Sequence, residues 1–310
     1  MKKPLSIALP GRGRLRAAAL ALAVLPGVLP IAGCSSLFIS RRKLPVPVAP
    51  AVIQNATADD LVARLNDAWS KFDSLTATVD ILASHIKLNE GTATDYPSCR
   101  SNLLLRKPGM LHILLKAPVV QTTIFNLASD GTNFTVTIPP KSVYYQGLNA
   151  SVGHSPNWYE NLRPGFLFNA MVVRGLAPDE RYSVISESIT EEDAANKRLL
   201  IRPEYVLNIV RPKANSQELY EVRVIRFHRE DLLPYQQDLY NENGVLQTQV
   251  IYGAYKDYDG YQYPSTITLK RPQDETQLVM SVERVTYNPA LTDDQFKLTI
   301  PPNYTRQELK

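Results

Sequence analysis

The spacing of apolar residues changes near residue 75. Over residues 59–73, apolar side chains recur every three or four positions, which predicts one amphipathic helix. Asp59 and Asp60 suit its first turn because acidic side chains are favourable at a helix N-terminus. The apolar face of this helix consists of Leu61, Leu65, Ala68, Trp69 and Phe72.

From Leu75 onward the period is two. In "LTATVDI", residues 75–81, apolar residues alternate with Thr and Asp, as in a half-buried strand. Turn signals then separate one strand from the next, which indicates an antiparallel meander. These signals are "KPG" at 107–109, "SDG" at 129–131, "ENG" at 242–244 and "YDG" at 258–260.

Residues 102–118, "NLLLRKPGMLHILLKAP", are apolar at consecutive positions, so strands here would present apolar side chains to both faces of a sheet. The second face needs a cover, either a layer of helices or, in part, a bound lipid chain. A second helix is predicted at 164–174, since Pro164 suits a helix start, Gly175 follows the end, and the segment is almost uncharged. This helix is a candidate lid over the apolar face.

Residues 1–33 have the features of a secretory signal, with a basic start, an apolar run from Ala17 to Leu29 and small residues after it. "IAGC", which ends at Cys34, resembles the bacterial lipobox. That resemblance implies cleavage before Cys34 and attachment of three acyl chains to it. The alternative is an ordinary signal peptide followed by a free cysteine. The residue after Cys34 is Ser35, which by the enteric sorting rule indicates the outer membrane.

Residues 34–57 are rich in Pro, Val and Ala and lack acids, which predicts a semi-extended tether before a single domain at 58–310. The formal charge of +4 comes from the signal. Removing its five basic residues from the 34 Lys and Arg leaves 29 against 30 Asp and Glu. The mature chain is therefore near neutral, and the charge gives no support to nucleic-acid binding.

No catalytic or metal constellation is recognisable, so we expect neither enzymatic activity nor a cofactor. The four histidines are widely separated. Cys99 has no partner once Cys34 is acylated, and is expected to be a buried structural thiol. The acidic stretch at 186–196 suggests a solvated turn. The tyrosines of residues 252–263 are expected to form cross-strand pairs, although contact with glycan, headgroups or a partner is the alternative.

Five motifs in order resemble the periplasmic lipoprotein carrier and outer-membrane lipoprotein receptor, the LolA/LolB-like superfamily. They are "LVARLNDAWSKFDSLTATV", "LLLRKPGMLHI", "SDGTNFTVTIPP", "RPGFLF" and "DDQFKLTIPPNY", the last as the closing strand. The resemblance implies a mainly β fold with helices (α+β): a curved, antiparallel, unclosed barrel covered by helices on its concave face. We expect about ten strands between Leu75 and Tyr304.

The resemblance also implies roles for residues. The carrier holds its lid through an arginine before the turn proline, a position occupied here by Lys107 with Arg106 before it. In a strand these two side chains point to opposite faces, so only one can face a cavity. The membrane-inserting loop of the receptor corresponds to Val119 and Val120, for which ordinary edge packing is the alternative.

The function implied is a membrane-anchored lipoprotein whose cavity binds lipid or lipoprotein acyl chains during sorting to the outer membrane. Its partners would be membrane lipid, acylated clients and a periplasmic carrier or export complex. A structural or sensory lipoprotein with a core filled by its own side chains is the alternative. The expected cavity residues are Leu103, Leu105, Leu111, Ile113 and Leu115 from the strands, with Phe166, Leu167 and Met171 from the lid.

Overall fold

The structure is a computed structural model that describes residues 46–50, 52–87, 89–149, 163–193, 196 and 198–307. These residues belong to one compact unit, Val46–Lys310. The predicted signal and Cys34 lie outside the described residues.

Helix α1 spans Ala58–Lys71, close to the predicted range. It begins at Thr57, whose side chain accepts a hydrogen bond from the Asp60 amide while the Asp60 carboxylate accepts one from the Thr57 amide. This capping box satisfies two amides that the first turn would leave without partners. Leu61, Val62 and Leu65 lie on its buried face.

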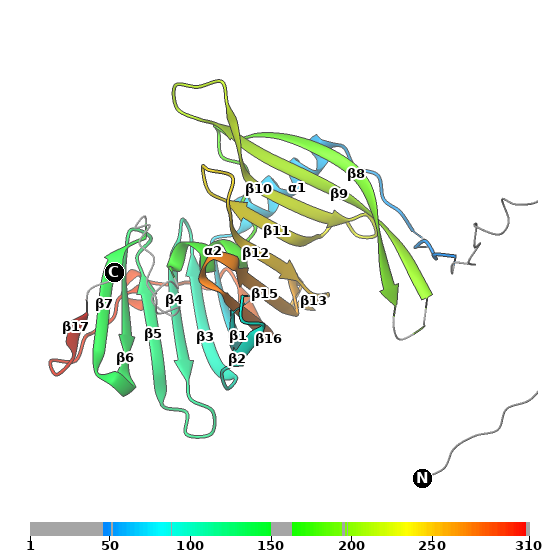
Figure 1. Cartoon of the computed structure of the whole chain (residues 1–310). Helices are drawn as coiled ribbons and strands as arrows, with labels where there is room; N and C mark the ends of the chain where they lie inside the picture. Colours follow the sequence, from blue (N-terminus) through cyan, green and yellow to red (C-terminus); the bar gives the residue numbers. More distant parts are fainter. Residues whose placement is uncertain are drawn as a thin grey trace, which may run out of the picture. The chain divides into compact units, whose positions relative to one another are not determined.

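Fifteen of the described strands form one large curved sheet (Figure 1). The strands of the first half are β1 (Ser74–Lys87), β2 (Thr92–Asp95), β3 (Cys99–Arg106), β4 (Met110–Lys116), β5 (Thr123–Ser129), β6 (Asn133–Ile138) and β7 (Val143–Leu148). Those of the second half are β8 (Arg181–Asp193), β9 (Arg198–Pro212), β10 (Leu219–His228), β11 (Pro234–Tyr240), β12 (Leu246–Tyr252), β15 (Thr266–Arg271), β16 (Thr276–Tyr287) and β17 (Thr305–Gln307). A separate hairpin consists of β13 (Tyr255–Tyr258) and β14 (Tyr261–Pro264).

The strand order is β17-β7-β6-β5-β4-β3-β1-β16-β15-β12-β11-β10-β9-β8, and β2 pairs with β1. The sheet does not close, because β17 and β8 lie at opposite ends of this order. Every pair is antiparallel except β17–β7. Strand β1 lies at the middle of the sheet, between β3 and β16, so the two halves of the chain meet there.

Three sequence expectations are corrected by this topology. The strand count of about ten is too low. The acidic stretch at 186–193 is not a turn but part of β8, whose side chains are mostly exposed. The predicted closing strand is also wrong: Asp293–Phe296 is a 3-10 turn (η4), and β17 begins only at Thr305.

Helix α2 spans Pro164–Met171, with Pro164 at its first position as predicted. It packs against the larger of two apolar clusters, which the strands of β1, β3–β7, β12, β15 and β16 build with it. The smaller cluster joins α1 to β9 and β10. Val173, just after α2, packs against both clusters and connects them.

The end of the predicted tether is attached to the sheet. Val48 donates a backbone hydrogen bond to Leu199 and accepts one from Ile201. Gln54 likewise donates to the carbonyl of Arg229. The chain is therefore fastened to β9 and to the β10–β11 loop before α1 begins.

Candidate functional site

An apolar cavity of about 270 Å³ lies between α2 and the central strands. Its walls come from α2 on one side and from β1, β4, β5 and β16 on the other. The inward alternation of β1 and β16 supplies one wall because side chains two positions apart share a face. The apolar wall residues are Ile81, Ala83, Ile113, Leu115, Phe125, Leu167, Met171, Leu278 and Met280.

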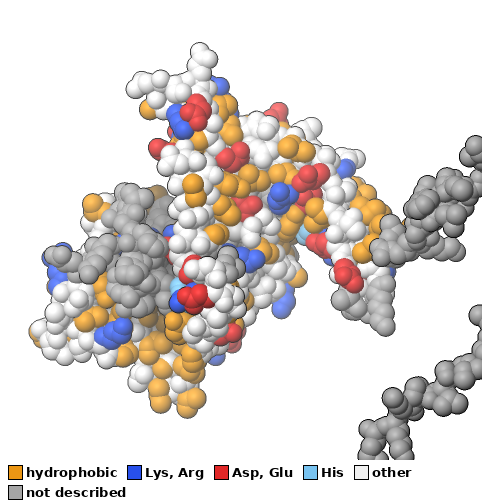
Figure 2. Space-filling view, viewed as in Figure 1, with side chains coloured by type: hydrophobic (Ala, Val, Ile, Leu, Met, Phe, Trp, Pro, Cys, Tyr) orange, Lys and Arg blue, Asp and Glu red, His pale blue; other side chains and the backbone are white. Residues whose placement is uncertain are grey.

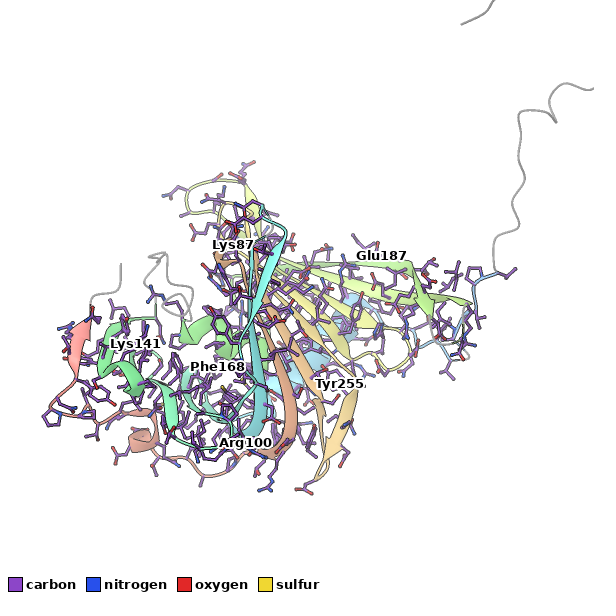
Figure 3. All side chains as sticks on the ribbon, turned by 60° about the horizontal axis from the view of Figure 1, so that its bottom comes forward. Lys87, Arg100, Lys141, Phe168, Glu187 and Tyr255 are labelled. Carbon is purple, nitrogen blue, oxygen red and sulfur yellow. The ribbon has the colours of Figure 1, made fainter. Side chains whose placement is uncertain are left out.

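The mouth of the cavity lies where β3 starts and β4 ends. Tyr96 and Pro97 from the β2–β3 loop, Ile124 from β5 and Lys141 from the η1 turn (Pro139–Lys141) line it. Lys141 is exposed, and Figure 3 labels it. The polar lining side chains are Tyr96, Lys141 and the buried thiol of Cys99.

Cys99 is buried, as predicted from its isolation in the sequence. Its Sγ lies 3.3 Å from the carbonyl oxygen of Pro97, to which it donates. Burial raises the pKa of the thiol, because a thiolate would be poorly solvated there. The group is therefore a neutral thiol in the cavity wall.

The eight residues expected to form the cavity divide into two groups. Ile113, Leu115, Leu167 and Met171 line it. The other four do not belong to its lining. Three of them, Leu103, Leu105 and Leu111, are fully buried between strands and are part of the packed core. Phe166 instead lies under the guanidinium of Arg271, 4.0 Å from the ring centroid.

Arg106 and Lys107 point to opposite sides of the chain, but both contact elements other than α2. Lys107 donates to the carbonyl of Trp69 at the end of α1, and its Nζ lies 4.6 Å from the centroid of the Trp69 ring. Arg106 donates to the carbonyl of Leu291, 2.6 Å away, and pairs with Asp293. Instead of contacting the lid, as expected, Lys107 holds the end of α1 and Arg106 holds the C-terminal segment.

Other residues hold the end of α2, and sequence reasoning missed them. Gln237 of β11 donates to the carbonyl of Asn169 at 3.0 Å, and Tyr263 of β14 to that of Met171 at 2.9 Å. Arg223 of β10 is fully buried and donates to the carbonyls of Arg174 and Gly175 at 2.8 and 2.7 Å. Carbonyls at a helix end have no partner within the helix, so Gln237 and Tyr263 satisfy the end of α2. Arg223 instead holds the segment that follows the helix.

Arg223 is one of several charged groups buried behind this segment. Burial lowers the pKa of Arg223 to about 10. The Glu180 carboxylate, 3.6 Å away, is fully buried and accepts from Arg174 and from the Ala177 amide. Burial alone would raise the pKa of Glu180, but these hydrogen bonds lower it, so the group is ionised at neutral pH. Arg223 and Glu180 together hold residues 174–180 against strand β10.

Gly175 is small because α1 approaches it closely. A Cβ at this position would lie 2.7 Å from Oδ1 of Asn66 and 3.2 Å from the Trp69 ring. The same Asn66 oxygen accepts a hydrogen bond from the Leu176 amide at 2.9 Å. The sequence suggested this glycine as a helix end, whereas α2 ends four residues earlier. Its actual role is to let two segments pack.

The loop between β4 and β5 carries the two valines of the predicted membrane contact. Val119 is 95% exposed and Val120 is 67% exposed. Figure 2 shows hydrophobic side chains gathered at the lower end of the molecule, where this loop lies in Figure 1. Val119 also has a φ of 69°, which a β-branched residue rarely adopts. The loop holds an apolar side chain in water at a backbone angle that costs free energy, a combination that suggests a function other than folding.

The residues that precede and follow this loop in the sequence line the cavity. Leu115, near the end of β4, lines the cavity, and so do Ile124 and Phe125 at the start of β5. The exposed valines are carried by the short connection between these two strand ends.

Comparison with known proteins gives the following similarities. A protein-family model described as "Uncharacterized protein" matches residues 179–299. None of the curated proteins compared with the sequence matches it.

Proteins of the superfamily that the sequence resembles are among the structural neighbours. A LolA superfamily protein from Nitrosomonas europaea is 14% identical and has a TM-score of 0.48; the match covers 79% of this chain and 99% of that one. A protein described as an outer membrane lipoprotein-sorting protein domain, from Vibrio parahaemolyticus, is 14% identical with a TM-score of 0.45, covering 77% and 94%. A DUF1329 family protein from Desulfovibrio piger is 13% identical with a TM-score of 0.42, covering 77% and 95%.

A second cavity, of about 390 Å³, lies among the clustered tyrosines. Its walls come from α1, from residues 171–173 and from the β13–β14 hairpin. Tyr258 and Tyr261 pair across this hairpin, which agrees with the cross-strand interpretation. Tyr255, labelled in Figure 3, donates to the carbonyl of Pro234 at 2.8 Å. Met171 lines both cavities, so the end of α2 separates them.

The described part of the chain holds neither a membrane-spanning helix nor a metal-binding group of side chains. Neither of its α-helices is long and apolar enough to cross a bilayer. Its His, Cys, Asp and Glu side chains form no group of three or more that could hold a metal ion.

Proposed function

We propose that this chain is a lipid-anchored protein of the bacterial envelope that receives acyl chains in the cavity beneath α2. The observation that carries the proposal is the cavity itself, whose deep walls are apolar and whose mouth lies beside a loop with two exposed valines. A packed protein interior contains few voids larger than a water molecule. An apolar cavity of this size is therefore a candidate for a ligand.

The energetics favour exchange with a membrane over irreversible capture. An engineered cavity of about 150 Å³ takes up one benzene molecule, so 270 Å³ corresponds to roughly ten carbon atoms. Each buried methylene contributes about 0.8 kcal/mol, or about 8 kcal/mol for ten. The bilayer that the chain leaves gives nearly the same gain. Small changes in the protein, such as movement of α2, then decide the direction of transfer.

In this proposal α2 is the movable cover. Leu167 and Met171 form its side of the cavity. Gln237 and Tyr263 hold its C-terminal end, and Arg223 holds the residues just after it. An opening movement would therefore pivot about residues 169–175 and lift the N-terminal end of the helix. The exposed valines of the β4–β5 loop would meanwhile contact the membrane surface from which the chain enters.

The anchor is assigned to Cys34 through the lipobox-like sequence "IAGC". Three acyl chains hold a protein on a bilayer essentially permanently, since one chain alone is only marginal. With Ser35 after the cysteine, we place the protein on the periplasmic face of the outer membrane. There it would act in lipoprotein sorting or transport and would meet a periplasmic carrier or export complex.

Native mass spectrometry tests the proposal on the chain expressed without residues 1–33 and with Cys34→Ser. We expect a co-purified lipid, or uptake of added fatty acid. Ala83→Phe should prevent this binding because Ala83 lines the cavity, which the larger ring would fill. Leu82→Phe is the matched control, since Leu82 is exposed and lies on the other face of β1. Absence of any acyl ligand from the parent would favour the alternative, a structural or sensory lipoprotein.

A further inference from the structure

The second cavity, of about 390 Å³, carries an inference about how an acyl ligand is held. We call it the tyrosine cavity, since its lining includes Tyr252, Tyr255, Tyr261 and Tyr263. This inference rests on the proposed function and makes it more specific. We propose that the tyrosine cavity binds the ester or amide linkage of an acyl chain whose tail lies beneath α2, and that the hydroxyl of Tyr252 donates a hydrogen bond to the linkage carbonyl.

The first argument is the state of the Tyr252 hydroxyl. Tyr252 lines the tyrosine cavity and is only 5% exposed. Two other hydroxyls of this lining have partners, since Tyr255 donates to the carbonyl of Pro234 and Tyr263 to that of Met171. The buried hydroxyl of Tyr252 has no hydrogen-bond partner within the described part of the chain. Burying a hydroxyl in this way costs free energy, which an acceptor atom of a ligand would restore.

The second argument is that the two cavities adjoin. Met171 lines both of them. Its backbone is held, because its carbonyl accepts a hydrogen bond from Tyr263 at 2.9 Å, but its side chain is unbranched and adapts readily to new neighbours. The space beneath α2 corresponds to roughly ten carbon atoms, so the remainder of a longer chain must lie elsewhere. A shift of the Met171 side chain would let that remainder continue into the tyrosine cavity.

The third argument concerns which polar group fits beside Tyr252. Burial raises the pKa of this phenol more than the charge of Arg223 lowers it, so the hydroxyl keeps its proton at neutral pH and can donate it. Arg223 is already paired with the buried Glu180. An anion at this depth would therefore add a buried negative charge without a cation of its own, which is costly. A neutral carbonyl needs only the hydrogen bond from Tyr252.

The linings of the two cavities also decide the direction of the chain. The wall beneath α2 includes Leu167, Leu278 and Met280, which offer no hydrogen bond, so the tail fits there. The tyrosine cavity has exposed lining residues on α1 and β14, such as Ala68 and Gln262, which place its opening between these elements. The part of the ligand beyond the linkage would leave through this opening. The chains of a lipoprotein client fit this arrangement, since they are attached through ester and amide carbonyls.

Photo-crosslinking to the Cys34→Ser chain without residues 1–33 tests the direction of the bound chain. The probes are two palmitoylglycerols, one with a diazirine at the end of the tail and one with a diazirine beside the ester. Mass spectrometry of the labelled peptides should place the tail diazirine on β4, β5 or α2. The diazirine beside the ester should label α1 or the β13–β14 hairpin. Any other pattern, including the reverse one, would overturn the inference.

The affinities of 1-palmitoylglycerol and of its ether analogue, 1-O-hexadecylglycerol, test the role of Tyr252. The parent should bind the ester about two- to tenfold more tightly, the range for one hydrogen bond between neutral groups, because the ether lacks the carbonyl. Tyr252→Phe should bind the two lipids equally. Tyr258→Phe is the matched control and should keep the preference, because Tyr258 donates to the carbonyl of Val282 and does not belong to the cavity lining.

Thermal unfolding without ligand gives an independent measurement. Tyr252→Phe should leave the unfolding midpoint unchanged or raise it, since its hydroxyl makes no hydrogen bond with the described residues, whereas Tyr263→Phe should lower the midpoint. A lowered midpoint in Tyr252→Phe would contradict the assignment. Equal affinity of the parent for ester and ether would refute the hydrogen bond from Tyr252 but leave the proposed function standing. Failure of both lipids and of added fatty acid to bind would refute the proposed function as well.

Discussion

Two leucines of the predicted cavity set differ sharply in their surroundings, and truncating each to alanine should separate core from cavity wall. Leu105 is fully buried and pairs with Leu75 on one side and Leu111 on the other, both also fully buried. Leu105→Ala should therefore cost about 3 kcal/mol of unfolding free energy, within the range for a leucine deleted from a packed core. Leu115 is partly exposed and already borders empty space. Leu115→Ala should cost only about 1 kcal/mol, since fewer contacts are lost.

Urea denaturation of the two variants measures these free energies, and dodecanoate affinity is measured on the same samples. Leu105→Ala should leave affinity within about twofold when the protein is folded, whereas Leu115→Ala should change affinity and shift the preferred chain length upward. Equal destabilisation by both variants, with no change in ligand preference, would show that the region around Leu115 is ordinary core. The cavity interpretation would then be wrong.

Three further outcomes are expected. Arg223→Met leaves the carbonyls of Arg174 and Gly175 without this donor and removes one ion pair of the buried Glu180. It should therefore cost about 2–4 kcal/mol of unfolding free energy in thermal or urea unfolding. A cost below about 1 kcal/mol would contradict the structural role assigned to Arg223. The folded-state pKa of Glu180 is lowered, so its stabilising contribution is present above the ordinary pKa of 4.5 and is lost as the pH falls through the folded-state pKa. The unfolding free energy of Glu180→Gln should therefore depend less steeply on pH in that acidic range than that of the parent. Parallel plots of unfolding free energy against pH for the two proteins would contradict this. Val119→Gly relieves the strained φ and should not destabilise the protein. Because the variant loses an exposed apolar side chain, less of the protein should sediment with anionic vesicles. Unchanged sedimentation would exclude the loop as a membrane contact.

The sequence predicted the elements whose signals are local. Helix α1 was predicted because its acidic first turn and its apolar stripe lie within one short segment. Glycines mark several turns because Gly131, Gly244 and Gly260 adopt positive φ. Strand β8 was missed for a physical reason. Its side chains are mostly exposed on both faces, so the alternation that identifies a half-buried strand is absent. Its acids instead pair with arginines, for example Glu191 with Arg202 of the neighbouring strand β9 and Glu187 with Arg226 of β10.

The site was predicted less completely than the fold. The alternation of β3 and β4 indicates which side chains point inward, but it does not distinguish a cavity wall from a filled core. That difference depends on side chains from β16 and α2, which are far apart in sequence. Arg223 could not be identified as a residue that holds the segment after α2, because its partners are backbone carbonyls, which any residue type provides. Lys107 was noticed, yet its partner is α1 and not the lid.

The central position of β1 has a consequence for how the chain reaches its folded state. Leu75 pairs with Tyr287, about 210 residues further along the chain, so the sheet is completed only after nearly all of the chain is available. Pairings of such long sequence separation are formed slowly, because the loop entropy is lost before the contact is gained. Until β16 arrives, one edge of β1 remains open and the apolar side chains of Val79 and Ile81 lack part of their cover. A chain that starts to fold from its N-terminus would therefore expose this open strand edge until β16 is available, and an exposed strand edge favours aggregation.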